Sequence, residues 1–248
     1  MKIAVPLKYV PDTETRIKIS GDGKTTNTEG VSFVMNPYDE YALEEALKIR
    51  EAQGGEVTVI TVGEGDAVKA LRTGMAMGAD KAIHIKTAAG YDPSHSAKAL
   101  ANALKGGGWD FIITGMKAVD SDSGAVGAML AEFLNLPCIT MITKLEIKGD
   151  KATCRRESEL GVETVETRLP AVFTAQKGLN EPRYPSLKGI MMAKKKPVEE
   201  ISAGETSVLT EVVEMKYPPE RAAGRIVGEG VEAVPELVRL LREEAKVL

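Results

Sequence analysis

Short apolar runs alternate with amphipathic segments along the first 142 residues. Runs of buried-strand length occur at KIAVP, EVTVITVG, KAIHIK, FIITG and PCITMI. Between them, apolar residues recur at helical spacing within 38–49, 66–77, 92–104 and 126–134. Strands that alternate with helices in this way form a parallel sheet with helices on both faces. We therefore expect an α/β fold with a doubly wound, mostly parallel Rossmann-like sheet, which binds ligands beyond the carboxyl ends of its strands.

The pattern changes after Lys144. The segments KLEIKGDKATCRRE and GVETVETRLPAVFTAQ predict antiparallel strands with a turn at Gly149 and Asp150, which extend or cap the sheet. Earlier, residues 12–30 are polar and carry several glycines, which predicts an excursion with a hairpin near Gly21.

The last quarter of the chain is irregular. Residues 177–196 show little periodicity and predict a long ordered loop, a type of segment that is often functional. Its apolar residues either form a partner surface or fold back onto the core; they are Leu187, Ile190, Met191 and Met192. Residues 198–230 predict a polar arm, and Val231 to Val247 predicts a short amphipathic helix. We divide the chain into an α/β domain, 1–197, which includes a recognition loop at 177–197, and a C-terminal arm and helix, 198–248.

Composition excludes several classes of function. The net charge of −4 argues against general nucleic-acid binding, which needs a basic surface. No apolar run reaches the length of a membrane span and the N-terminus lacks a signal-peptide pattern, so a cytoplasmic location is expected. Cys138 and Cys154 form no CxxC motif and predict two reduced structural thiols. With only His84 and His95 available, no metal site and no serine-type triad are expected.

A polar loop between FIITG and AMLAEFL is the candidate ligand site. Its sequence, GMKAVDSDSGAVG, joins a strand to a helix, and Asp122 and Ser123 stand where an N-cap is expected. Free backbone N–H groups at a helix start favour an anion such as a phosphate. The alternative is an ordinary strand-to-helix connection, since the loop has neither a P-loop motif nor GxGxxG.

Four segments resemble the beta subunit of electron-transfer flavoproteins, in the same order over nearly the whole chain. They are MNPYDEYALEEA, RTGMAMGAD, GMKAVDSDSGAVG and LNEPRYPSLKGIMMAKKKP. The resemblance implies a nucleotide-binding α/β domain that pairs with an alpha subunit, which holds most of the FAD, while the beta subunit binds a structural AMP. It further implies that the C-terminal arm and helix pack on the alpha subunit. The AMP contacts carried over from the family fall on Pro6, Asn36, Pro37, Tyr38, Asp39, Val62, Gly115, Met116, Lys117, Ala118, Val119, Asp120, Ser121, Asp122, Ser123, Gly124, Ala125 and Val126.

Some positions bear on which nucleotide is bound. Ala125 replaces a glutamine that is usual in the family, so nucleotide contacts here should depend more on the backbone. Asp120 or Asp122 could accept hydrogen bonds from ribose or adenine. A subset of the family binds a second FAD in place of AMP and bifurcates electrons. Tyr38 resembles the ordinary branch and VPDT at 10–13 resembles the bifurcating one, and we favour AMP.

The implied function is electron transfer without bond chemistry in this chain, so it is not expected to be an enzyme. The heterodimer would take electrons from flavoprotein dehydrogenases, such as acyl-CoA dehydrogenase, and pass them to a quinone-linked oxidoreductase or another acceptor. The implied partner-binding residues are Arg183, Tyr184, Leu187, Ile190 and Met191, with Leu187 as the anchor. Two alternatives remain: a bifurcating subunit with a second FAD, and a stand-alone nucleotide-binding module, against which the missing Walker lysine and serine argue.

Overall fold

The computed structural model describes residues 1–88, 92–220 and 223–248. Its centre is a nine-stranded sheet in the order β11-β5-β4-β1-β6-β10-β7-β8-β9. The strands are β1 (Lys2–Pro6), β4 (Glu56–Gly63), β5 (Lys81–Lys86), β6 (Phe111–Gly115), β7 (Cys138–Lys148), β8 (Lys151–Ser158), β9 (Gly161–Arg168), β10 (Ala171–Ala175) and β11 (Glu199–Ser202). A separate antiparallel pair is formed by β2 (Tyr9–Pro11) and β3 (Phe33–Met35). The α/β class and the mostly parallel sheet are confirmed.

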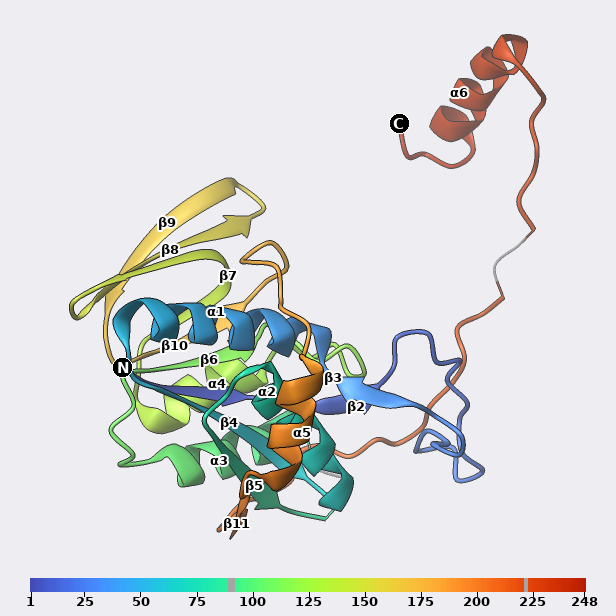
Figure 1. Cartoon of the computed structure of the whole chain (residues 1–248). Coiled ribbons are helices and arrows are strands. Elements are labelled where there is room, and N and C mark those ends of the chain that lie inside the picture. Colours follow the sequence, from blue (N-terminus) through green and yellow to red (C-terminus); the bar gives the residue numbers. More distant parts are fainter. Residues whose placement is uncertain (89–91, 221–222) are drawn as a thin grey trace.

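Helices cover both faces of this sheet (Figure 1). On one face lie α1 (Pro37–Gln53), α2 (Val68–Met77), preceded by the 3-10 turn η1 (Gly65–Ala67), and α5 (Leu187–Lys195). On the other face lie α3 (Pro93–Leu104) and α4 (Val126–Leu134). Successive strand residues point to opposite faces, so Ile3 and Val5 join the first core and Ala4 joins the second. The expected buried stripe of α1 is confirmed at Ala42, Leu43, Ala46, Leu47 and Ile49.

The antiparallel extension differs from the expectation in one strand. As expected, β7 pairs antiparallel with β8 across a turn at Gly149, and β8 pairs antiparallel with β9. By contrast, β10 lies between β6 and β7 and is parallel to both. The expectation that AVFTA continues the antiparallel strands was therefore wrong. All five residues of β10 are buried, as a strand covered on both faces requires.

Two further elements were not expected. The predicted loop at 177–196 contains helix α5, which begins after Ser186, whose side chain accepts a hydrogen bond from the Gly189 N–H at 3.0 Å. The segment expected to be a polar arm begins with β11, which pairs in parallel with β5 at the edge of the sheet. The hairpin in 12–30 is confirmed by the antiparallel bridge between Ile19 and Thr26.

The rest of the C-terminal segment runs along the body and then leaves it. The Met215 N–H donates to the Gly23 carbonyl at 2.7 Å, and Tyr217 Oη accepts from the Ile19 N–H at 2.9 Å. The predicted terminal helix is confirmed as η2 (Val231–Ala233) and α6 (Val234–Glu243), and none of these residues is buried. In Figure 1, α6 stands apart from the sheet at the end of an extended stretch of chain.

Both cysteines are free thiols, as expected. Cys154 is fully buried in β8, and burial raises its pKa to about 12, so it stays protonated at neutral pH. His84 is buried in β5, where Nε2 lies 3.0 Å from the Gly63 carbonyl oxygen, which fits a strand residue rather than a catalyst. Within the described ranges, no helix is long and apolar enough to cross a membrane. In the same ranges, no group of three or more His, Cys, Asp or Glu residues is arranged to hold a metal ion.

Candidate functional site

A cavity of about 150 Å³ opens at the carboxyl ends of β1, β4 and β6. β1 lies between β4 and β6, so the chain leaves it on one side through α1 and later returns on the other side through α3. Reversal of strand order at this point separates the loops that follow the strands and creates a crevice for ligands. The crevice is therefore a consequence of topology, and its chemistry depends on the loops that line it.

Asp39, at the start of α1, connects two of these loops. Its carboxylate accepts hydrogen bonds from the Lys8 N–H at 2.7 Å and from the Gly115 N–H at 3.2 Å. The Asn36 side-chain amide donates to the same carboxylate at 2.9 Å. Asp39 is buried, and this desolvation raises its pKa to about 7, against the lowering effect of its hydrogen-bond donors. A single carboxylate thus fixes the ends of β1 and β6 relative to α1.

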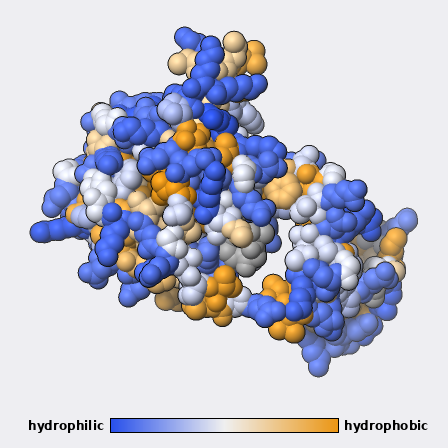
Figure 2. Space-filling model, turned by 90° about the horizontal axis from the view of Figure 1, so that it is seen from below, coloured by the Kyte–Doolittle hydropathy of each residue, from blue (hydrophilic) through white to orange (hydrophobic). Residues whose placement is uncertain are grey.

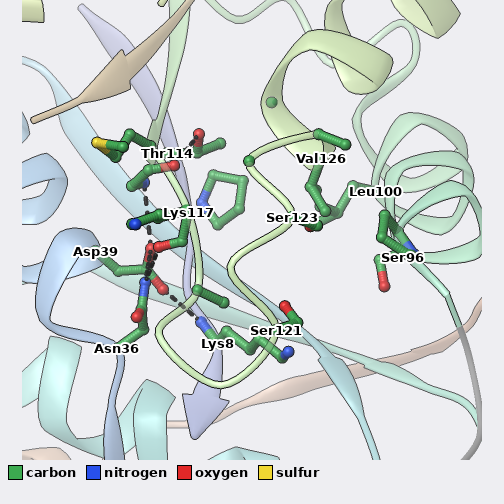
Figure 3. Close-up of a pocket in the computed structure, with 18 of the residues that line it drawn as sticks. Lys8, Asn36, Asp39, Ser96, Leu100, Thr114, Lys117, Ser121, Ser123 and Val126 are labelled. Carbon is green, nitrogen blue, oxygen red and sulfur yellow. Dashed lines mark hydrogen bonds between the residues drawn. The ribbon is translucent and has the colours of Figure 1, made fainter. Parts of the chain in front are cut away.

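Asn36 extends this connection into the polar loop. Its amide nitrogen also donates to the Lys117 carbonyl at 2.9 Å, and its amide oxygen accepts from the Val119 N–H at 3.1 Å. Figure 3 shows Asn36, Asp39 and Lys8 together on one side of the cavity, facing the polar loop. The path of the loop is therefore set by side chains from the segment before α1.

Gly115 is required by this close approach. A Cβ at this position would lie 2.3 Å from Asp39 Oδ1 and 2.8 Å from the backbone carbon of Tyr38. Glycine allows the end of β6 to pass directly over the start of α1. The contact with Asp39 therefore explains why a glycine ends β6.

Two lysines with paired aspartates line the mouth of the cavity. Lys8 Nζ lies 2.7 Å from Asp120, and Lys117 Nζ lies 2.7 Å from Asp122. Asp122 adopts a left-handed backbone conformation with φ of 55°, and its side chain is 66% exposed. Helix α4 begins at Val126 as expected, but Ala125 is at the N-cap and there is no side-chain cap. The expectation that Asp122 or Ser123 caps this helix was therefore wrong.

The first turn of α4 nevertheless faces the cavity with backbone donors. The N–H groups at the start of a helix have no intrahelical partner, and the helix dipole adds a partial positive charge there. Ser123 lies near Val126 of this turn, and Ser121 lies farther along the loop, near Lys8 (Figure 3). Gly127 brings the turn close to β10, since a Cβ there would lie 2.5 Å from the Thr174 methyl group. An anionic group fits at this end, while Pro6, Val62 and Leu100 give the cavity an apolar wall.

The structure brings most of the predicted nucleotide contacts to this cavity. Its lining includes Pro6, Asn36, Asp39, Val62, Gly115, Met116, Lys117, Ala118, Ser121, Ser123, Gly124, Ala125 and Val126. Predicted contacts that border the site without lining the cavity are Pro37, Tyr38, Val119, Asp120 and Asp122. Lining residues absent from the prediction are Leu7, Lys8, Asp92, Pro93, Ser96, Leu100, Thr114 and Gly127. Lys8 and the Asp92-Pro93 helix start could have been found, because both follow strands whose carboxyl ends meet at this edge.

The predicted partner-binding residues lie elsewhere, at and before α5. The side chain exposures are 95% for Tyr184, 84% for Leu187 and 68% for Met191, and Ile190 is also exposed. These residues do not fold back onto the core, so that alternative was wrong. Arg183 differs from them, because its guanidinium turns inward onto α1 and contacts Glu44 at 2.8 Å.

Comparison with known proteins gives matches over the whole chain. Residues 24–206 match the model of the electron transfer flavoprotein domain. The chain is 45% identical to the electron transfer flavoprotein subunit beta of Bacillus subtilis, with both chains covered completely. It is 40% identical to the protein of the same name from Syntrophomonas wolfei, over all of this chain and 98% of the relative. The mitochondrial electron transfer flavoprotein subunit beta of Arabidopsis thaliana is 38% identical, again with both chains covered completely.

The chain belongs to the electron transfer flavoprotein beta subunit family. Membership explains why the motifs quoted above follow one another in a fixed order along a single chain. The family is one of electron carriers.

Proposed function

We propose that this chain is the beta subunit of a heterodimeric electron-transfer flavoprotein, which pairs with an alpha subunit and carries electrons between a flavoprotein dehydrogenase and an acceptor. The observation that carries the proposal is full-length similarity to electron transfer flavoprotein beta subunits together with a crevice at the switch point of the sheet. FAD, held mainly by the alpha subunit, would supply the redox chemistry. This chain would contribute binding and orientation, and full-length similarity favours this role over a stand-alone nucleotide-binding module.

The ligand proposed for the crevice is AMP. A phosphate would bind at the first turn of α4, where backbone N–H groups are free and Ser123 lies close by. Lys117 or Lys8 could replace its aspartate partner by the phosphate, since both ion pairs are at the mouth of the cavity. The adenine would rest against the apolar wall formed by Pro6, Val62 and Leu100. Ala125 offers no side-chain polar group, so these contacts are made by backbone and neighbouring side chains, as the sequence suggested.

A docking role is proposed for the exposed face of α5 and the residues before it. Leu187, Met191 and Tyr184 are large side chains that remain exposed although a folded core lies directly beneath them. Exposed apolar groups of this kind mark interaction surfaces. A flavoprotein dehydrogenase, such as an acyl-CoA dehydrogenase, would bind Leu187, and a quinone-linked oxidoreductase is the proposed acceptor for the electrons.

The C-terminal segment is proposed to pack on the alpha subunit. Helix α6 has a polar face held by pairs of Arg239 with Glu236 and Glu243 and an apolar face that includes Val234 and Leu237. It stands away from the sheet (Figure 1), and none of its residues is buried. An amphipathic helix gains stability mainly by burying its apolar face, which a partner subunit would provide. On the face seen in Figure 2, apolar residues form several separate groups rather than one continuous patch, which agrees with an extended interface.

Nucleotide counting on the co-purified heterodimer tests this proposal. The ligands are released by denaturation, FAD is quantified by absorbance, and AMP is quantified by chromatography and mass. We expect one FAD and one AMP for each pair of subunits. Two FAD molecules and no AMP would assign the chain to the bifurcating branch. A beta chain that remains a monomer in the presence of its alpha subunit would refute the heterodimer.

A further inference from the structure

Two glutamates are buried side by side in the middle of α1. Glu44 is 5% exposed and Glu45 is 7% exposed, although neither belongs to the apolar stripe of the helix. Buried carboxylates are costly unless they are paired and hydrogen-bonded. Their main partners come from a segment more than 130 residues further along the chain. Asn180 donates to Glu45 at 2.9 Å, and Arg183 donates to Glu44 through its backbone N–H at 3.1 Å and its side chain.

The guanidinium of Arg183 donates four hydrogen bonds to carboxylates of α1. Nε and Nη2 donate to the two oxygens of Glu44 at 2.8 and 3.0 Å, and Nη1 and Nη2 donate to the two oxygens of Glu51. This is a paired fork geometry that lysine cannot reproduce. The two carboxylates hold the pKa of Arg183 above its ordinary value. An ion pair between Arg183 and another protein would require it to leave these partners.

Arg183 lies shortly before the exposed face of α5 in the sequence. Leu187 follows Arg183 by four residues, and the far end of α5 is fixed separately by Arg72, which donates to the Ala193 and Lys196 carbonyls. Between the two ends, Gly189 packs against α2 so closely that a Cβ would lie 2.3 Å from the Ala76 carbonyl oxygen. The exposed side chains are therefore held on a rigid support, which lowers the entropy that docking must overcome.

We propose that Arg183 is a positioning residue: it acts through Glu44 and Glu51 to hold the α5 face in its docking geometry, and does not itself contact the dehydrogenase. This rests on the proposed docking role of α5, and it changes the role expected for Arg183 from the sequence. Substitution of Glu44 distinguishes positioning of α5 from direct contact with the dehydrogenase, because Glu44 is buried in α1 and a docked protein cannot reach it.

The test uses the intact heterodimer and a purified acyl-CoA dehydrogenase that reduces the wild-type heterodimer. KM for the heterodimer and kcat are measured for Arg183→Gln, Arg183→Lys, Glu44→Gln and the double variant Arg183→Gln/Glu44→Gln. Lys81→Gln serves as the charge-matched control, since Lys81 of β5 makes an exposed ion pair with Glu56 of β4 at 2.7 Å. Leu187→Ala reports on the docking surface itself. Hydrogen exchange of residues 184–195 is followed in the same samples.

We expect Arg183→Gln to raise KM about tenfold, with kcat and flavin content unchanged and faster exchange over 184–195. Glu44→Gln should raise KM in the same direction, the double variant should be no worse than Arg183→Gln alone, and Arg183→Lys should restore part of the affinity. Lys81→Gln should match the wild type. Should Arg183→Gln not fold, Arg183→Lys and Glu44→Gln still carry the comparison.

Three outcomes would overturn the inference. A normal KM for Glu44→Gln beside a raised KM for Arg183→Gln means that Arg183 contacts the dehydrogenase directly. Normal KM values for every Arg183 and Glu44 variant, with Leu187→Ala impaired, leave the docking surface in place and remove the positioning role. A normal KM for Leu187→Ala removes the docking function of α5, and the positioning role with it.

Discussion

The carboxylate of Asp92 holds Thr210, accepting hydrogen bonds from its backbone N–H at 2.9 Å and from its hydroxyl at 3.0 Å. The same oxygen accepts from the Leu209 N–H at 2.8 Å, while the other oxygen caps α3 through the His95 N–H at 2.8 Å. Although burial opposes ionisation, these donors lower the pKa of Asp92. Asp92 also lines the nucleotide crevice. One side chain thus connects the crevice, the start of α3 and the C-terminal segment.

Asp92→Asn should release the C-terminal segment and keep the helix cap. An asparagine retains one oxygen for His95, but its amide nitrogen is itself a donor and cannot accept from Leu209 and Thr210. We expect the amides of 205–215 to exchange faster with a melting temperature close to that of the wild type. Asp92→Ala should also lose the cap, at a cost of about 1 kcal/mol. Unchanged exchange at 209 and 210 in Asp92→Asn would contradict the tether.

Gly115→Ala should disrupt the nucleotide crevice. The added Cβ would meet Asp39 and the backbone of Tyr38, so the end of β6 has to move, at a cost of about 1–3 kcal/mol. We expect AMP content to fall in the purified heterodimer. Gly21→Ala is the matched control, because nothing lies within 4 Å of a Cβ at that exposed turn. Full AMP content in Gly115→Ala would mean that the contact with Asp39 is dispensable.

Asp39 should give stability a specific pH dependence. Its pKa rises from 3.8 to about 7 on folding, so the native state binds the proton more tightly than the unfolded state does. The free energy of unfolding should therefore fall as pH rises from about 4 to about 7 and level off above, with a slope of at most about 1.4 kcal/mol per pH unit. Subtracting the curve of Asp39→Asn isolates this contribution. A flat difference across that interval would show that Asp39 is already ionised at pH 4.

Leu187→Ala should weaken docking and leave the fold intact. Leu187 is 84% exposed, so its loss removes little from the core, while burial in a partner is worth roughly 1.5–3 kcal/mol, or about one to two decades of affinity. Electron acceptance should fall, with unchanged melting temperature and nucleotide content. Leu71→Ala is the opposite control: Leu71 is fully buried, and its loss should cost about 2–5 kcal/mol of stability. Normal electron acceptance by Leu187→Ala would refute the docking role.

Most of the fold could be predicted because its elements are encoded locally. The run FIITG and the stripe of α1 identify a strand and a helix by periodicity alone, and glycine stops such as Gly78 end helices where expected. AVFTA follows antiparallel strands in the sequence, so its parallel pairing as β10 was not predicted. All of its residues are buried, which is typical of a central strand. Helix α5 was missed because Gly189 weakens the helical signal, and its close contact with Ala76 of α2 cannot be read from the sequence.

The candidate site also has a part that the sequence predicts and a part that it does not. The position of the crevice follows from strand order, and the family resemblance added Pro6 of β1, Val62 of β4 and the loop after β6, but Leu7 and Lys8 directly after β1 were missed. Asp122 was expected to cap α4 because it has the right residue type near the right place, but its left-handed backbone and its pair with Lys117 direct it outward. The contact between Arg183 and Glu44 joins residues 139 positions apart, and no local pattern encodes such a pair.

The place of β10 has a consequence for biosynthesis. During synthesis β6 and β7 emerge from the ribosome first, but the strand that joins them comes only after the β8–β9 hairpin. One contact of the crevice depends on β10, because the Ala175 carbonyl accepts from the Met116 N–H at 2.9 Å. Non-local pairing of this kind is slow to form and leaves strand edges exposed meanwhile. A nascent chain shorter than 175 residues therefore cannot complete the crevice, and its open strand edges make it a substrate for chaperones until β10 is inserted.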